Sequence, residues 1–284
     1  MPRTHRRPNP LRWVLVTMRS RRRVLTQLAA LSAGGLAACG APENGRPTLV
    51  DGPSTTTTLP EFGQVLRGPA ELQPIGATEV ADVDPSVDRS FVASARPDVI
   101  EVFDQPNGQI THEMANPTPT GGRLIFLTTM NESDWHQVLL PIRPNGSTGW
   151  VRNSDVDLAV HNFRIQIDLQ DFRCRVFERG VPIFDTVAGV AANNTPTPGG
   201  LYYLTELIAP AEPDTVYGSF AYGLSGFSEV FETFNGGPGQ LGIHGTNDPE
   251  TLGTAVSAGC IRLHDDDIAR LVTYLPLGVP VDVI

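Results

Sequence analysis

The chain has 284 residues and a formal net charge of −10, and 40% of its residues are hydrophobic. Its length suits two domains of ordinary size. Eight arginines lie within residues 1–38, which hold no acidic residue, so the rest of the chain carries 13 arginines against 31 acidic residues. Because phosphate binding needs a basic face, this acidity argues against a nucleic-acid partner.

Residues 1–39 have the pattern of an export signal, because a run of arginines precedes an apolar stretch of small residues and leucines that ends at Cys39. Arg21 and Arg22 resemble a twin-arginine signal, and Leu36–Cys39 resembles a lipoprotein cleavage box. The resemblance implies that Cys39 becomes lipidated, which would anchor an extracytoplasmic protein to the outer face of the cell membrane. The alternative is a short spanning anchor, although the apolar run falls short of the ~20 residues that a spanning helix needs.

Residues 40–83 are rich in proline, glycine and threonine, as in the string DGPSTTTTLPEFG. Such a composition buries too little apolar surface to fold alone. We therefore expect a flexible tether that lets the folded part reach away from the membrane.

Residues 84–158 contain short runs that are typical of strands and are separated by Pro-Asn-Gly turns at 106–108 and 144–146. This pattern predicts a small β-barrel. The string DWHQVLLPIRPNGSTGWV resembles bacterial SH3-like domains. Its Trp135 and Trp150 either pack the core of the barrel or line a ligand groove.

Residues 160–284 continue with strand-like runs and end with one helical pattern. Asp265, Asp266 or Asp267 can cap a helix whose apolar positions recur at helical spacing and which stops at Pro276 and Gly278. The sequence therefore predicts an all-β protein, with the barrel followed by a β-sandwich that carries one short helix. Cys174 alternates with polar neighbours and is expected to face a core.

The segment IHGTNDPETLGTAVSAGCIRL contains the residues most suited to catalysis. A cysteine attacks as its thiolate, which is a minor species near neutral pH at the ordinary pKa of ~8.5. If His244 lies within hydrogen-bond reach, it can accept the thiol proton of Cys260 and then stabilise the thiolate. Gly259 permits a tight turn, from which its own amide and that of Cys260 could stabilise an oxyanion.

The same segment resembles the signature of the L,D-transpeptidase catalytic domain of the YkuD type. That pattern is His-Gly, a spacer of a dozen or more residues, then Ser/Thr-x-Gly-Cys followed by an apolar residue and Arg or Asn. His244-Gly245-Thr246 and Ser257-Ala258-Gly259-Cys260-Ile261-Arg262 match it, and Thr195–Gly200 resembles a loop on the substrate side of the family's site. Many members have His where this chain has Ala258.

The resemblance implies a role for each matching residue. Cys260 would be the nucleophile, His244 the general base and then acid, Ser257 the residue that orients His244 through its backbone carbonyl, and Gly259 with Cys260 the oxyanion donors. Gly245 and Thr246 would contact the substrate. Arg262 would either bind a substrate carboxylate or brace the loop through a salt bridge.

The substrate that the resemblance implies is the tetrapeptide stem of peptidoglycan, which would be joined into 3-to-3 cross-links without a cofactor or a metal. If water resolved the thioester, the enzyme would be an L,D-carboxypeptidase. Three further alternatives are a zinc hydrolase that uses His244, Cys260 and His264, a sortase, and a non-catalytic cell-wall-binding lipoprotein. SAGCIR does not fit the Thr-Leu-x-Thr pattern that precedes a sortase cysteine. We expect a monomer.

Overall fold

The computed structural model describes residues 73–74, 88–209, 214–234 and 237–284. The predicted export signal, including Cys39, and most of the predicted tether lie outside these residues. Two tether residues are described: Gln73–Pro74 form strand β1 and pair with β8. Within the described part of the chain, no helix is both long enough and apolar enough to cross a membrane.

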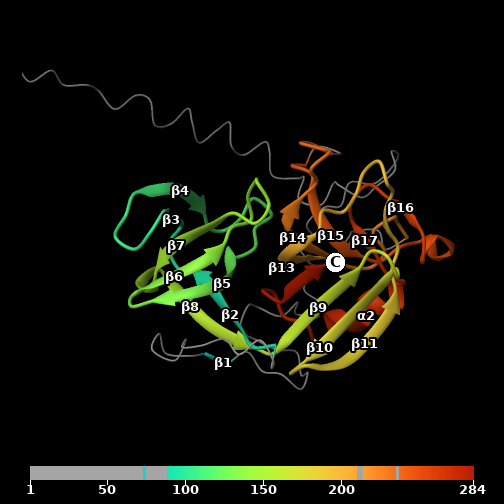
Figure 1. The fold of residues 1–284 in the computed structure, drawn as a ribbon, viewed down its shortest axis with the longest axis horizontal. Coiled ribbons are helices and arrows are strands. Elements are labelled where there is room, and N and C mark those ends of the chain that lie inside the picture. The colour runs from blue at the N-terminus through green and yellow to red at the C-terminus, as the bar shows by residue number, and fades with distance from the viewer. Residues whose placement is uncertain (1–72, 75–87, 210–213, 235–236) are drawn as a thin grey trace, which may run out of the picture. The chain divides into compact units, whose positions relative to one another are not determined.

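The first described region is an eight-stranded sheet in the order β1-β8-β2-β5-β6-β7-β3-β4, which we call the N-terminal sheet (Figure 1). Its core consists of side chains such as Phe91, Ile100, Phe126 and Val151. The strands are β1 (Gln73–Pro74), β2 (Ser90–Ala95), β3 (Val99–Phe103), β4 (Ile110–Ala115), β5 (Ile125–Glu132), β6 (Trp135–Leu139), β7 (Thr148–Arg152) and β8 (Val156–His161).

The second described region is another eight-stranded sheet, in the order β11-β10-β9-β18-β13-β14-β15-β17, which we call the C-terminal sheet (Figure 1). A separate parallel pair, β12 (Val190–Ala191) with β16 (Ala255–Ser257), accompanies it. Its strands are β9 (Phe163–Asp168), β10 (Arg173–Glu178), β11 (Val181–Val187), β13 (Gly200–Ile208), β14 (Ala221–Phe227), β15 (Gln240–His244), β17 (Ile261–Arg262) and β18 (Pro280–Val283).

Most pairings in the C-terminal sheet are antiparallel, but two are parallel. β18 pairs with β9, which brings the end of the chain to the start of this region. β15 pairs with β17, with Ile243 opposite Ile261 and His244 opposite Arg262. The second pairing therefore joins the two halves of the predicted catalytic motif, although Cys260 comes 16 positions after His244 in the chain.

One α-helix is present in the described residues, α2 (Asp265–Val272). Its N-cap is His264, whose Nδ1 accepts a hydrogen bond from the Asp266 amide at 3.3 Å, so none of the three aspartates predicted as caps has that role. The aspartates instead occupy the first turn, where the helix dipole favours negative charge. Ile268 and Leu271 are buried in the core of the C-terminal sheet.

The predicted fold class is confirmed, because the described chain is mostly strand with one short helix. The predicted boundary between the two folded regions differs from the observed one. β8 continues to His161 within the N-terminal sheet and β9 begins at Phe163, whereas the sequence suggested a change near residues 158–160. Cys174 is fully buried on β10, as expected from its alternation with polar neighbours.

The two sheets contact each other through Tyr203 of β13. Its ring packs in a buried cluster with Val92, Ile125, Leu127 and Leu139 of the N-terminal sheet. Its hydroxyl donates a hydrogen bond of 3.0 Å to the backbone carbonyl of Ile125. The buried phenol thus finds the polar partner that its environment requires.

Replacing Tyr203 by Phe should lower the free energy of unfolding by roughly 1–2 kcal/mol, because the Ile125 carbonyl loses this buried donor. Urea denaturation of the purified chain measures the change. The matched control is Tyr274→Phe, since the Tyr274 hydroxyl makes no hydrogen bond within the described residues. Equal losses of unfolding free energy in the two variants would show that the hydrogen bond from Tyr203 to Ile125 does not stabilise the protein.

Candidate active site

The parallel pairing of β15 with β17 determines which side chains meet. Ile243 and Ile261 face each other in the register and are both buried in the core of the C-terminal sheet. Because side chains alternate along a strand, His244 and Arg262 project from the opposite face. Cys260 directly precedes Ile261, and the same alternation directs it to the face that carries His244.

Tyr217 gives independent evidence that these residues share one site. Its ring lies 5.1 Å from the His244 ring, centroid to centroid, in a tilted arrangement. Tyr217 also forms a small buried cluster with Cys260, against which Val216 and Phe234 pack. The histidine and the cysteine therefore have a common aromatic neighbour.

The His244 ring is held by one backbone hydrogen bond. Its Nδ1 lies 2.6 Å from the carbonyl oxygen of Gly245. Because a carbonyl only accepts, Nδ1 must carry the hydrogen, so the neutral ring has its lone pair on Nε2. Nε2 is buried and has no hydrogen-bond partner within the described residues. This tautomer is the one that can accept a proton through Nε2.

The same environment keeps the imidazole neutral. Burial, with a smaller contribution from the nearby positive charge of Arg262, lowers the pKa of His244 to about 4, although the hydrogen bond to Gly245 opposes the shift. Only 1% of the residue is exposed. His244 is therefore a proton acceptor over the whole range near neutral pH.

Cys260 is as deeply buried as His244, with 1% of its surface exposed. A cysteine attacks as its thiolate, so any nucleophilic role of Cys260 belongs to the reduced residue. The reactions considered below therefore start from reduced protein.

Ser257 and Gly259 build the turn that precedes Cys260. The Ser257 hydroxyl donates to the Cys260 carbonyl at 2.5 Å and accepts from the Gly259 amide at 3.2 Å. Gly259 has a φ of 133°, in a region that disfavours any residue with a Cβ. The glycine therefore permits the turn, and Ser257 fixes its shape.

These contacts correct two of the roles expected for the motif. The carbonyl that holds His244 belongs to Gly245, whereas the Ser257 carbonyl accepts hydrogen bonds from Ala192 and Thr195. The Gly259 amide is occupied by the Ser257 hydroxyl, so it does not point to an open oxyanion position here. Sequence reasoning assigned both roles from the family pattern, which does not specify backbone partners.

The loop before β13 is attached to the same turn. Thr197 is buried, and its hydroxyl donates to the Gly259 carbonyl at 2.7 Å. Thr195 donates to the Ser257 carbonyl at 3.0 Å. The predicted substrate-side loop, Thr195–Gly200, thus borders the Cys260 turn, and its last two residues, Gly199 and Gly200, are exposed.

Arg262 lies on β17, two residues after Cys260 and opposite His244 in the register. Its backbone exchanges two hydrogen bonds of 2.8 Å with Gly189. Burial lowers the pKa of its guanidinium, whereas the electrostatic influence of Asp248 and Tyr217 raises it. Arg262 therefore supplies positive charge close to His244, which is compatible with either of its two expected roles.

Gly245 and Thr246 form a buried corner after β15 rather than an open binding edge. A Cβ on Gly245 would lie 2.3 Å from the Asp265 carboxylate, so no larger residue fits. Thr246 is 5% exposed, and its hydroxyl accepts a hydrogen bond from the Asp248 amide. Both residues therefore belong to the buried surroundings of His244.

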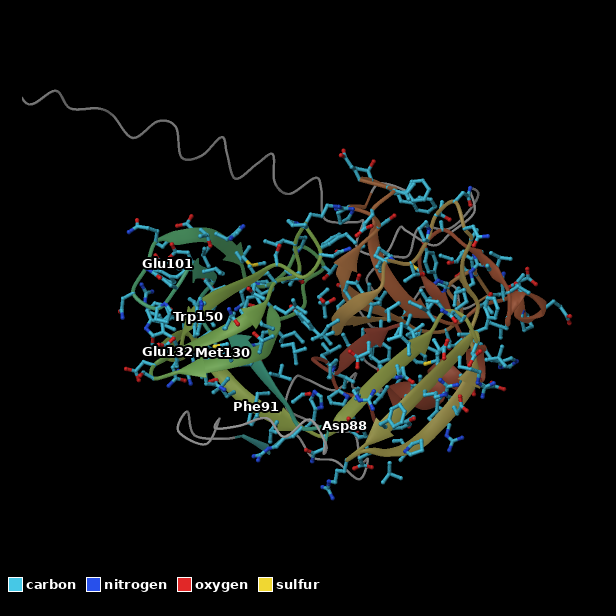
Figure 2. All side chains as sticks on the ribbon, viewed as in Figure 1. Asp88, Phe91, Glu101, Met130, Glu132 and Trp150 are labelled. Carbon is cyan, nitrogen blue, oxygen red and sulfur yellow. The ribbon has the colours of Figure 1, made fainter. Side chains whose placement is uncertain are left out.

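The tryptophans of the N-terminal sheet pack inside it. Trp135 lies edge-on to Phe103 at 4.9 Å, and Trp150 belongs to the same buried cluster. Trp150 lies on β7, whose neighbour β3 carries Glu101 (Figure 2). Glu101 forms an ion pair with Arg152. The burial of both tryptophans favours the interpretation that they pack the core over the interpretation that they line a ligand groove.

Tyr217 is the site residue that sequence reasoning missed. It lies in the string DTVYGSF, which has neither a strand pattern nor a match to the family motif. Only the next residue carries a local signal, because Gly218 has a positive φ of 63°. A Cβ on Gly218 would lie 2.7 Å from the Gly245 Cα, so the close approach of these two loops depends on glycine.

Residues 162–283 match the family model of YkuD, the L,D-transpeptidase catalytic domain. This region contains every site residue discussed above, from Thr195 to Arg262. The N-terminal sheet lies outside the match.

Curated relatives agree with this match. The chain is 30% identical over 121 residues to the putative L,D-transpeptidase YkuD of Bacillus licheniformis, covering 43% of this chain and 65% of the relative. It is 36% identical over 81 residues to the putative L,D-transpeptidase YqjB of Bacillus subtilis, covering 28% of this chain and 42% of the relative. The chain therefore spans less than two thirds of the length of these relatives.

Solved structures that are similar to this chain include an L,D-transpeptidase from Mycobacterium smegmatis. It has 16% sequence identity and a TM-score of 0.36, and the similarity covers 55% of this chain and 80% of that chain. L,D-transpeptidase 3 from Mycobacterium tuberculosis has 18% identity and a TM-score of 0.34, covering 50% of this chain and 76% of that chain.

Proposed function

We propose that the protein is a peptidoglycan L,D-transpeptidase that acts through a thioester on Cys260. The observation that carries the proposal is the buried Nε2 of His244, which has no hydrogen-bond partner among the described residues and lies on the face of the sheet to which Cys260 is directed. The family match of residues 162–283 supports the same chemistry. The stem tetrapeptide is the substrate class that this family implies.

In the first half-reaction, His244 Nε2 accepts the proton of the Cys260 thiol, and the sulfur attacks the carbonyl carbon of the third stem residue. The negative charge that develops on the carbonyl oxygen needs a donor, and the Cys260 amide is the remaining member of the expected pair. When the tetrahedral intermediate collapses, the bond to the terminal D-alanine breaks. The His244 imidazolium then gives its proton to the leaving amine, which leaves a thioester.

In the second half-reaction, the side-chain amine of a neighbouring stem attacks the thioester carbonyl. His244 again accepts a proton, this time from the amine, and later returns it to the departing Cys260 sulfur. The products are a 3-to-3 cross-link and the original thiol. If water enters instead of the amine, the product is a shortened tripeptide stem and the activity is that of an L,D-carboxypeptidase.

We further propose that the protein works outside the cytoplasm, attached through a lipid on Cys39, with the N-terminal sheet as an SH3-like accessory module. The support is the arginine-rich, alanine-rich start of the chain and the acidity of the remainder. Extracytoplasmic placement would bring the catalytic region to the cell wall, where its substrate lies.

The products of the reaction distinguish the two enzymatic outcomes. The reduced full chain, incubated with a disaccharide tetrapeptide, should release D-alanine and form a cross-linked dimer that mass spectrometry detects. Cys260→Ser should lower the rate by at least about 10³-fold, because a hydroxyl is a far weaker nucleophile beside this base. Cys174→Ala is the control, since that thiol is buried on β10 away from the site.

Tripeptide without dimer would instead assign the L,D-carboxypeptidase activity. Unchanged tetrapeptide would favour the non-catalytic wall-binding lipoprotein. Cross-linking that survives in Cys260→Ser would disprove the thioester mechanism.

A carbapenem should acylate Cys260 of the reduced protein, because its strained lactam carbonyl offers the nucleophile a stable acyl product. Intact-protein mass spectrometry should then show one adduct, and peptide mapping should locate it on Cys260. His244→Gln should slow adduct formation by about 10²- to 10⁴-fold, the usual contribution of a general base. An adduct that forms equally fast in His244→Gln would exclude the assigned base.

The rate should fall in acid only when His244 becomes protonated. Since burial lowers its pKa to about 4, kcat/KM should stay level as pH falls from 7 through 6.5 and should decline toward pH 4. A pH profile, with circular dichroism recorded at each pH as a check on folding, measures this. His112→Gln should not change the profile, because His112 is exposed on β4. A half-point near pH 6.5 would show that the base is an ordinary, solvated histidine.

A further inference from the structure

We propose that Arg143, which belongs to the N-terminal sheet, is a positioning residue for the active site of the C-terminal sheet. The expected effect of Arg143 on turnover rests on the function proposed above. The contacts that support its positioning role do not depend on the reaction. Arg143 lies between β6 and β7, outside the region that matches the catalytic family.

The guanidinium of Arg143 donates to three backbone carbonyls of the segment between β14 and β15. The distances are 2.8 Å to Pro238, 3.1 Å to Ser228 and 2.9 Å to Phe231. These acceptors lie on either side of residue 234 in the chain. One planar group with five N–H donors can join several acceptors in this way, which an ammonium cannot do with the same geometry.

Two neighbouring contacts fix the arginine where it is. Its guanidinium lies over the Phe227 ring at 4.7 Å from the centroid. Asn145, two residues further on, exchanges two hydrogen bonds of 2.8 Å with the Phe227 backbone. Gly239 allows the close approach, because a Cβ there would lie 2.3 Å from the Phe231 carbonyl oxygen and 3.1 Å from Arg143 Nη2.

The segment that Arg143 holds reaches the catalytic residues through two phenylalanines. The Phe231 ring contacts the Phe234 ring at 5.2 Å between centroids. Phe234 packs against the buried pair Tyr217 and Cys260, and Tyr217 in turn contacts His244. A continuous set of contacts therefore runs from Arg143 to the nucleophile and its base.

The consequence is that the apolar cover of Cys260 is set by a residue of another domain. With Arg143 in place, Phe234 holds Tyr217 and Cys260 away from water, which sustains the low pKa of His244 and excludes competing solvent from the thioester. Without Arg143, three carbonyls lose a charged donor and the Phe231–Phe234 pair loses its support. The cover over Cys260 should then open more often.

The test measures how readily Cys260 is alkylated, which does not depend on transpeptidase activity. Full-length reduced protein is treated with iodoacetamide, and mass spectrometry follows the modification of Cys260 and Cys174 separately. Arg143→Ala should raise the rate at Cys260 about tenfold and leave Cys174 unmodified. Arg143→Lys, which keeps the charge but loses the planar fork, should give an intermediate rate.

Arg96→Ala is the matched control, because Arg96 pairs with Asp157 and the Ser154 carbonyl within the N-terminal sheet. It should leave the rate at Cys260 within twofold of the native value. In disaccharide tetrapeptide assays, Arg143→Ala should raise KM and increase the share of hydrolysed tripeptide relative to cross-linked dimer. Arg96→Ala should change neither.

A rate at Cys260 within twofold of native in Arg143→Ala would overturn the proposal. Equal increases at Cys260 and Cys174 would also overturn it, because they would indicate general unfolding. If Arg143→Ala does not fold, Asn145→Ala, which removes the two contacts with Phe227, decides by the same criterion. If Arg143→Ala speeds alkylation of Cys260 alone but the native protein forms no detectable cross-links, the positioning role is supported and the proposed function is disproved.

Discussion

The parallel pairing of β15 with β17 is the constraint on which the active site depends. It joins two segments far apart in the motif, buries Ile243 and Ile261 in the core, and leaves His244, Cys260 and Arg262 to face the other way. The free energy that fixes the site thus comes from apolar side chains on the opposite face of the same strands. Gly245 and Gly259 lie next to the paired strands and allow the chain to turn there, because a side chain at either position would collide with a neighbouring residue.

Burial gives this site its chemical character. An imidazole and a thiol that are both removed from water are most stable in their neutral forms, so proton transfer between them is deferred until a substrate enters. The hydrogen bond from His244 to the Gly245 carbonyl sets the tautomer in advance, and Arg262 adds a positive charge that opposes premature protonation. Tyr217 and Phe234 provide the apolar surroundings. Arg143, from the loop between β6 and β7, donates to the carbonyl of Phe231, whose ring contacts Phe234.

Much of the architecture could be predicted from local pattern. Alternating runs such as those of β9 and β10 indicated strands, and the spacing of Ile268 and Leu271 indicated the helix. β2 and β8, rich in alanine and valine and buried throughout much of their length, lack the alternation that identifies a strand in a sequence. The motif identified His244 and Cys260, but it could not assign the carbonyl partner of His244 or the occupied Gly259 amide, because both are set by backbone geometry. Tyr217 was missed because it reaches the site through tertiary contact alone.

The threonine hydroxyls before β13 have a mechanical consequence. Thr195 and Thr197 attach their loop to the Ser257 and Gly259 carbonyls, so the loop and the turn that carries the sulfur form one cooperative segment although some sixty positions separate them. A peptide that binds along this loop and shifts it would therefore also move Cys260. Substrate alignment and sulfur alignment become a single adjustment instead of two.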